Sequence, residues 1–172
     1  EEGRAEVIKY GMIRSKELLE LLLTDDAERK RERVIARCVR LKRDVVAEDE
    51  QDFGERQILN FGHTLGHAIE REMNYKLFHG DCVAIGMAIM TRALVRDGRC
   101  PESCEKILEK LLKKYKLPNS TELPSERILA AARADKKRRG EKITLIEPKT
   151  LGNCVLVKRD FAELARLLEL GR

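Results

Sequence analysis

The chain has no tryptophan, and its three tyrosines and four phenylalanines make up only 4% of its 172 residues. With so few aromatic rings, we expect no platform that stacks the bases of single-stranded nucleic acid. The longest nearly apolar run, residues 82–90, is far shorter than the roughly 20 residues of a membrane-spanning helix. No apolar stretch follows the start in the manner of a signal peptide. The composition therefore argues against a nucleic-acid stacking module, a membrane protein and a secreted precursor.

A glycine-rich turn between a strand and a helix, which would cradle a dinucleotide, is also missing from the sequence. The chain therefore holds no recognisable nucleotide-binding half. Because it opens on Glu1 without an initiator methionine, we expect a fragment, a single domain or a processed product. Its length predicts one domain, large enough to bury a core.

Charged residues are plentiful but mixed, since 35 Lys and Arg oppose 30 Asp and Glu and leave a net charge of +5. Interleaved charges are typical of solvated helix faces, and so small a surplus allows only a weak attraction to anions. The five cysteines are odd in number, and Cys38 and Cys82 lie in helical apolar patterns. We therefore expect free thiols in a reducing cytoplasm. Cys100 and Cys104 have no second Cys or His pair at zinc-ribbon spacing, which favours a structural role.

Apolar residues recur mainly at helical spacing, and the predicted fold class is mostly α, with six or seven helices. The segment 82–90 is apolar all round, as in a helix at the centre of a bundle. Two β-rich runs predict a small β-hairpin near residues 142–158. Helices are predicted over residues 4–23, 26–48, 58–69, 82–90 and 101–115. Another helix is predicted from residue 124 into the basic stretch DKKRRG, and a final helix follows Asp160, which is its predicted N-cap.

The three histidines, His63, His67 and His79, fall within one window of 17 residues. His63 and His67 are four residues apart, so both project from one face of a helix. Thr64 stands where a metalloprotease would carry its glutamate base, which disfavours that class. From spacing alone, a metal-binding pair and a pair of half-buried polar histidines both remain open.

Two further polar residues, Arg56 and Asn60, continue this pattern with spacings of four, three and four up to His67. On one continuous helix, all four side chains would share a face. A guanidinium, an amide and two imidazoles in line suit an anionic, oxygen-rich ligand. The alternative for Arg56 and Asn60 is a solvated face near the helix start. Gly62 and Gly66 lie four residues apart on one face, where we expect a backbone, ligand or metal to approach closely.

The sequence contains the segments RQILNFGHTLGHAIE and LFHGDCVAIGM, with AEVIKYGMI near its start, and it also contains LKRDVVAEDEQDFGER and ADKKRRGEKITLIEP. Together these segments resemble the signature of the 3-dehydroquinate synthase family of sugar-phosphate cyclases. The resemblance implies that residues 1–172 form a single helical metal- and substrate-binding domain, the C-terminal domain of that dehydroquinate synthase-like fold. The family's N-terminal NAD-binding domain is not in this chain.

The resemblance also assigns roles to individual residues. It implies a metal site for Zn²⁺ or Co²⁺ at Glu6, His63 and His79, a set that suits a catalytic metal. His67 takes a proton-transfer role, and Asp52 stands where the family has a proton-accepting glutamate, one methylene longer. The implied substrate-binding residues are Lys9, Lys42, Arg56, Asn60 and Lys136.

The implied activity is that of a phosphorus–oxygen lyase of the shikimate pathway, which leads to chorismate and the aromatic amino acids. The substrate, 3-deoxy-D-arabino-heptulosonate 7-phosphate, would yield 3-dehydroquinate and phosphate through transient oxidation by NAD, metal-assisted elimination and aldol closure. Without the NAD domain, we expect this chain to bind metal but to be inactive alone. The expected partners are the sugar phosphate, the N-terminal domain and a second copy in a cytoplasmic homodimer, with no nucleic acid and no membrane.

Three alternatives stand beside this interpretation. A related cyclase, such as a 2-deoxy-scyllo-inosose synthase, would close a different ring, although Arg56 and Lys42 favour a substrate that bears a carboxylate. A non-catalytic helical module would hold metal but catalyse nothing by itself, an alternative that follows from the missing N-terminal half. A nucleic-acid binder around KKRRG is the weakest alternative, since no recognition-helix pattern accompanies that segment.

Overall fold

The computed structural model describes residues 2–49, 54–136 and 142–172, and these residues form the mostly α fold with one β-hairpin that the sequence predicts. The described part has eight α-helices and one 3₁₀-helix, more than the six or seven helices predicted. In chain order the elements are α1 (Glu2–Arg14), α2 (Lys16–Leu23), α3 (Arg31–Glu48), the 3₁₀-helix η1 (Glu55–Asn60), α4 (His63–Glu72), α5 (His79–Arg96), α6 (Glu102–Lys114), α7 (Ser125–Lys136), β1 (Lys142–Thr150), β2 (Asn153–Asp160) and α8 (Phe161–Gly171).

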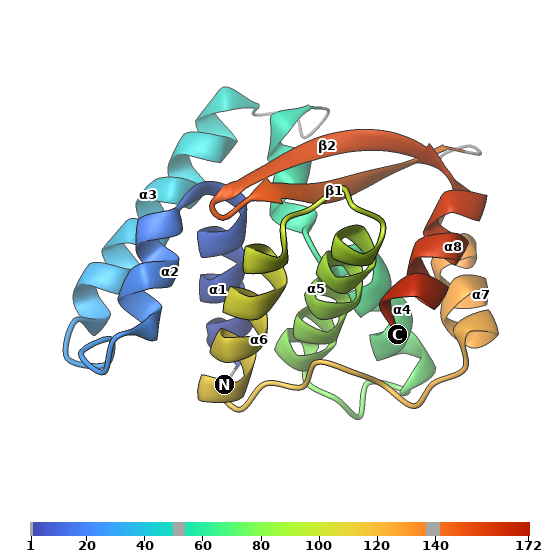
Figure 1. Cartoon of the computed structure of the whole chain (residues 1–172), viewed down its shortest axis with the longest axis horizontal. Helices are drawn as coiled ribbons and strands as arrows, with labels where there is room; N and C mark the ends of the chain where they lie inside the picture. The colour runs from blue at the N-terminus through green and yellow to red at the C-terminus, as the bar shows by residue number, and fades with distance from the viewer. Residues whose placement is uncertain (1, 50–53, 137–141) are drawn as a thin grey trace.

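Helix α5 forms the centre of the molecule, in contact with α1, α4, α6 and α8 (Figure 1). Every residue from Cys82 to Thr91 is buried, which confirms the prediction of a central helix that is apolar all round. Among the described helices, none combines the length and the apolar character that spanning a bilayer requires. Helices α1 and α4 both pack on α5. Glu6 of α1 lies beside His63 of α4, and the centroid of the His63 ring is 5.3 Å from that of His79 at the start of α5.

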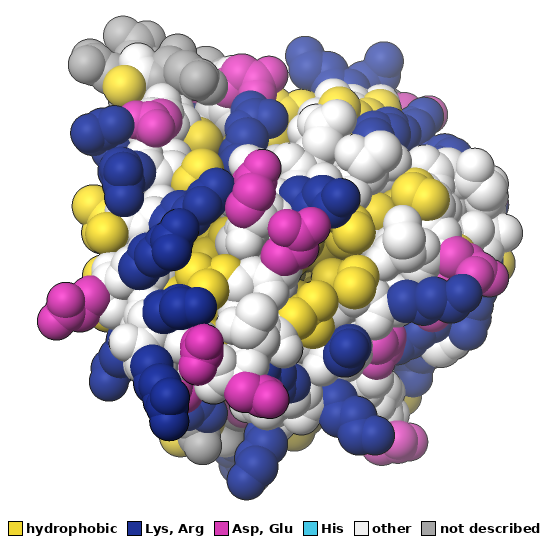
Figure 2. Space-filling view, turned by 60° about the vertical axis from the view of Figure 1, so that its left-hand side comes forward, with side chains coloured by type: hydrophobic (Ala, Val, Ile, Leu, Met, Phe, Trp, Pro, Cys, Tyr) yellow, Lys and Arg dark blue, Asp and Glu magenta, His cyan; other side chains and the backbone are white. Residues whose placement is uncertain are grey.

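Strands β1 and β2 pair antiparallel, from Lys142 opposite Asp160 to Pro148 opposite Cys154, and cross one end of the helices (Figure 1). The hairpin is therefore confirmed. Asp160 occupies the N-cap position of α8, as predicted, but its side chain makes no capping hydrogen bond. On the surface, Lys and Arg side chains are interspersed with Asp and Glu (Figure 2), in agreement with the mixed charge pattern of the sequence.

Two long predicted helices are shorter than expected. The predicted helix 4–23 is divided at Ser15, whose hydroxyl accepts a hydrogen bond from the Leu18 N–H at 3.2 Å and caps α2. The helix predicted from residue 26 begins only at Arg31, because the chain from Thr24 makes turns that Asp25 and Asp26 favour. In both places the local turn chemistry overrides a continuous apolar stripe.

The predicted continuous helix around residues 58–69 is wrong, because the chain breaks between η1 and α4. Gly62 adopts a left-handed conformation with φ of 79°, which ends η1 and starts α4 in a new direction. A Cβ at Gly62 would lie 2.5 Å from Met87 Cγ, so the glycine also permits close packing on α5. The spacing predicted that Arg56 and Asn60 share a helix face with the histidines. They lie on η1 instead and therefore do not share the α4 face of the histidines.

Candidate metal centre

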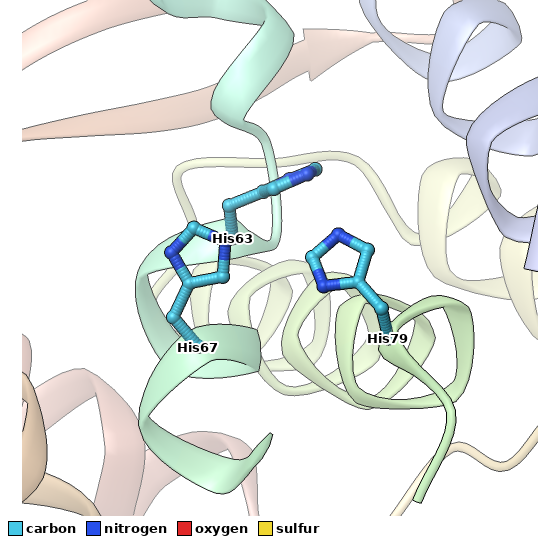
Figure 3. Close-up of side chains that lie close together, drawn as sticks. All are labelled: His63, His67 and His79. Carbon is cyan, nitrogen blue, oxygen red and sulfur yellow. The ribbon is translucent and has the colours of Figure 1, made fainter. Parts of the chain in front are cut away.

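The three histidines come together where two helices begin. His63 and His67 project from α4, and His79 is the first residue of α5 (Figure 3). Their ring centroids are 5.3 Å apart for His63–His67 and for His63–His79, and 5.5 Å apart for His67–His79. One potential ligand atom from each lies within 4.8 Å of the others. Within the described residues, no other group of three or more His, Cys, Asp or Glu side chains is arranged in this way.

Glycines hold α4 and α5 close enough to form this cluster. A Cβ at Gly86 of α5 would lie only 2.1 Å from the carbonyl oxygen of Gly62, and a Cβ at Gly66 would lie 3.1 Å from Val83 Cα. The close approach predicted at Gly62 and Gly66 is confirmed, and the group that approaches is the backbone of α5. The crossing therefore sets the distance between His79 and the two histidines of α4.

Glu6 of α1 adds a carboxylate beside His63. Its Oε2 accepts a hydrogen bond from Lys9 Nζ at 2.6 Å, while its Oε1 lies 3.5 Å from His63 Nε2. Glu6 Oε1 is buried and has no hydrogen-bond partner among the described residues. A buried carboxylate oxygen is costly to leave without a partner, so this atom is suited to a cation.

The hydrogen bond between His63 and the backbone of Phe61 determines the tautomer of the His63 ring. Nδ1 lies 3.1 Å from the Phe61 carbonyl oxygen, which can only accept, so Nδ1 carries the proton and Nε2 the lone pair. Burial and the nearby Lys9 ammonium lower the pKa of His63 to about 4, so the ring is neutral at pH 7. A lone pair that faces a carboxylate oxygen needs a cation between them.

His79 is held in a similar way by a residue that the sequence did not single out. Its Nδ1 lies 3.2 Å from Glu70 Oε2 of α4. Since a carboxylate only accepts, Nδ1 donates the proton of this hydrogen bond, which leaves Nε2 as the ring nitrogen available to a metal. The sequence carries no signal for Glu70, because its contact with His79 joins two helices.

The donor set fits a divalent metal such as zinc. A tetrahedral zinc ion with Zn–N bonds of about 2.05 Å places its ligand atoms roughly 3.3 Å apart. The Glu6–His63 pair matches this spacing, and the three histidines are within 4.8 Å. The geometry thus offers four candidate ligands, because His67 is grouped with His63 and His79, while Glu6 adjoins His63.

Lys9 and Lys42 bring positive charge to the same region. Lys9 is 3% exposed, and desolvation lowers its pKa although Glu6 acts in the opposite direction; the Lys42 ammonium on α3 lowers this pKa further. Two ammonium groups that interact unfavourably are stabilised by an anion placed near both. This pair therefore suits an anionic ligand next to the histidine cluster.

The remaining predicted site residues are spread over η1, α7 and a stretch outside the described residues. Asp49 Oδ2 accepts hydrogen bonds from the backbone N–H groups of Gly54 at 2.6 Å and Arg56 at 3.3 Å, which ties the end of α3 to η1. Asn60 is exposed at the end of η1. Lys136 is the last residue of α7, and only its position in that helix is described. Asp52 lies outside the described residues.

The five cysteines are all free and buried, which confirms the prediction of buried thiols for Cys38 and Cys82. Cys100 and Cys104 belong to no group of three or more potential metal ligands in the described ranges. Their structural role stays a prediction.

Two solved structures of sugar-phosphate cyclases share the fold of this chain. One is a 2-epi-5-epi-valiolone synthase from Streptomyces hygroscopicus subsp. jinggangensis, solved with NAD⁺ and Zn²⁺ bound. The match covers 98% of this chain and 50% of the synthase, with a TM-score of 0.83 and 23% identity. The other is a 2-deoxy-scyllo-inosose synthase complexed with carbaglucose-6-phosphate, NAD⁺ and Co²⁺. The match covers 99% of this chain and 51% of the synthase, with a TM-score of 0.71 and 20% identity.

The sequence comparison is more specific. Residues 3–138 match the family described as 3-dehydroquinate synthase C-terminal, and the chain therefore belongs to the 3-dehydroquinate synthase family, as its C-terminal domain. The 3-dehydroquinate synthase of Clostridium acetobutylicum is 45% identical over 98% of this chain and 49% of its own length. The chain thus spans about half the length of the curated relatives it matches.

Proposed function

We propose that this chain is the metal- and substrate-binding half of a 3-dehydroquinate synthase. The observation that carries the proposal is the buried Glu6 Oε1 that faces the lone pair of His63 beside His67 and His79, in a chain that belongs to this family. The whole enzyme would convert 3-deoxy-D-arabino-heptulosonate 7-phosphate to 3-dehydroquinate and phosphate. The second half of the enzyme would bind NAD, and the chain alone would bind metal without turning over substrate.

Glu6, His63 and His79 would hold the metal, Zn²⁺ or Co²⁺, as the residue types and the fit of their donor atoms support. When bound, the metal supplies Lewis-acid polarisation of a substrate hydroxyl. Lys9 holds Glu6 Oε2 and leaves Oε1 directed at His63, so it orients one ligand as well as supplying charge. His67 is exposed beside the other two rings, where its imidazole would accept or return a proton.

The substrate has a carboxylate and a phosphate, and the proposed binding residues supply matching groups. Lys9 and Lys42 would contact its anionic groups, as their mutual repulsion supports. Arg56 would bind an anionic group through its guanidinium and Asn60 a hydroxyl, both from η1. Asp52 would take the proton-accepting role of the family's glutamate. Lys136 completes the proposed binding set through the family pattern. These residues would act mainly by holding the substrate in position for several chemical steps.

The partners and setting belong to the same proposal. The whole enzyme would be a homodimer in the cytoplasm, joined to an N-terminal NAD-binding domain. The two cyclase structures with NAD⁺ bound are twice the length of this chain, which supports a cofactor held mainly by another domain.

Two measurements test the proposal. The zinc content of the purified chain should approach one ion per chain and fall to background in the His63→Ala/His79→Ala variant; an unchanged content in that variant would contradict the metal set. The zinc-loaded chain with NAD should release no phosphate from the heptulosonate 7-phosphate, whereas the two-domain protein should release it. Production of 3-dehydroquinate by this chain alone would contradict the proposal that turnover needs the NAD-binding domain.

The competing cyclase activity is distinguished on the two-domain protein. Glucose 6-phosphate has the ring and phosphate that carbaglucose-6-phosphate mimics in the inosose synthase structure. We expect phosphate release from the carboxylate-bearing substrate and none from glucose 6-phosphate. The reverse preference would assign the chain to an inosose-type cyclase.

A further inference from the structure

Glu70 contacts the candidate metal centre without belonging to the proposed ligand set. It lies on α4 and reaches across to α5, where its Oε2 is 3.2 Å from Nδ1 of His79. Its side chain is 18% exposed. Within the described ranges, His79 is the only partner in a salt bridge with this carboxylate.

His63 and His79 differ in how their rings are restrained. The His63 side chain is 13% exposed, and its Nδ1 is fixed by the backbone oxygen of Phe61. The His79 side chain is 38% exposed and stands on the first residue of its helix, so surrounding atoms restrain it less. The hydrogen bond to Glu70 therefore restrains the orientation of the His79 ring.

We infer that Glu70 is a positioning residue that holds His79 with Nδ1 protonated and Nε2 directed to the metal. A carboxylate behind a histidine ligand fixes the tautomer and the ring angle and makes the ligand nitrogen more basic, so its loss weakens metal binding. The inference rests on the proposed metal set, because it requires His79 to be a ligand. It adds a positioning side chain from α4 to the three proposed metal ligands.

The test compares zinc affinity and the Co²⁺ absorption spectrum of variants of this chain. Glu70→Ala removes the acceptor, and zinc affinity should fall about 10- to 100-fold, with changed intensity of the Co²⁺ visible bands. Glu70→Gln keeps the shape and an amide oxygen that can accept from Nδ1, and should lose less affinity than Glu70→Ala. The matched control is Glu72→Ala on the same helix, since Glu72 pairs with Arg127 at 2.7 Å; it should bind zinc as the unmodified chain does.

His79→Ala separates the two ways in which the idea can fail. If His79→Ala loses zinc affinity but both Glu70 variants bind within twofold of the unmodified chain with the same Co²⁺ spectrum, the inference about Glu70 is wrong and the metal set stands. If His79→Ala also leaves affinity unchanged, the metal set itself is wrong, and the inference falls with it. Circular dichroism of each variant establishes that it is folded. If Glu70→Ala does not fold, the comparison of zinc affinity is made with Glu70→Gln.

Discussion

Replacing Gly86 with alanine should destabilise the fold and weaken metal binding together, because this glycine sets the α4–α5 distance. The new Cβ would lie 2.1 Å from the carbonyl oxygen of Gly62, about 1 Å less than a normal contact, and 3.0 Å from the Gly66 nitrogen. Both obstacles are backbone atoms, which cannot rotate away. We therefore take the upper end of the cost of overpacking, about 3 kcal/mol. Alanine regains about 1 kcal/mol in helix propensity, which leaves a loss of about 2 kcal/mol.

For a domain of this size, a loss of about 2 kcal/mol lowers the melting temperature by roughly 4–8 °C. The assay is thermal unfolding followed by circular dichroism, together with zinc titration against a chromophoric chelator. The matched control is Gly3→Ala, where a Cβ on α1 meets nothing within 4 Å; this variant should be as stable as the unmodified chain or slightly more so. If Gly86→Ala melts within about 1 °C of the unmodified chain and keeps its zinc affinity, the reasoning about the crossing is refuted.

Three further predictions follow from other parts of the molecule. Hydrogen bonds from Arg166, and next from Arg99, lower the pKa of Asp97 and of Glu163 to about 2, from ordinary values of 3.8 and 4.5. These ion pairs therefore stabilise the fold above about pH 4.5, and their contribution is lost as the pH falls towards 2. Arg166→Gln should therefore move acid unfolding to higher pH, and an unchanged midpoint by circular dichroism would contradict this. Asp49→Ala removes the acceptor that ties α3 to η1 and should reduce the free energy of unfolding by about 1 kcal/mol in urea titrations, whereas no change would show the tie to be unimportant. Free zinc at 100 times its Kd should stabilise the chain by about 2.7 kcal/mol, and the absence of a higher melting temperature would contradict a folded-state site.

The sequence predicted the elements whose local patterns agree with their tertiary surroundings. The all-apolar stretch of α5, the proline before α6 and the hairpin around Gly152 each carry a strong local signal, and each is found. The division at Ser15 was missed although a capping serine was present, because the apolar stripe continued across it.

The candidate site was only partly predictable for a physical reason. A glycine in a helical pattern does not reveal its φ angle, so the break at Gly62, and with it the separation of Arg56 and Asn60 from the histidine face, required the structure. Glu70 and His79 meet only because two helices cross, and no spacing along the chain encodes that contact. The proposed ligand set came from family resemblance, while spacing alone would have paired His63 with His67.

The central claim is that Glu6, His63 and His79 hold the metal, with His67 beside them. The most direct test is a crystal structure of the zinc-loaded chain with anomalous data collected on both sides of the zinc absorption edge. The account predicts one anomalous peak within bonding distance of a Glu6 oxygen and of Nε2 of both His63 and His79, with Glu70 still bonded to His79 Nδ1. A peak bonded to all three histidines and not to Glu6, or one at the Cys100–Cys104 pair, would contradict it.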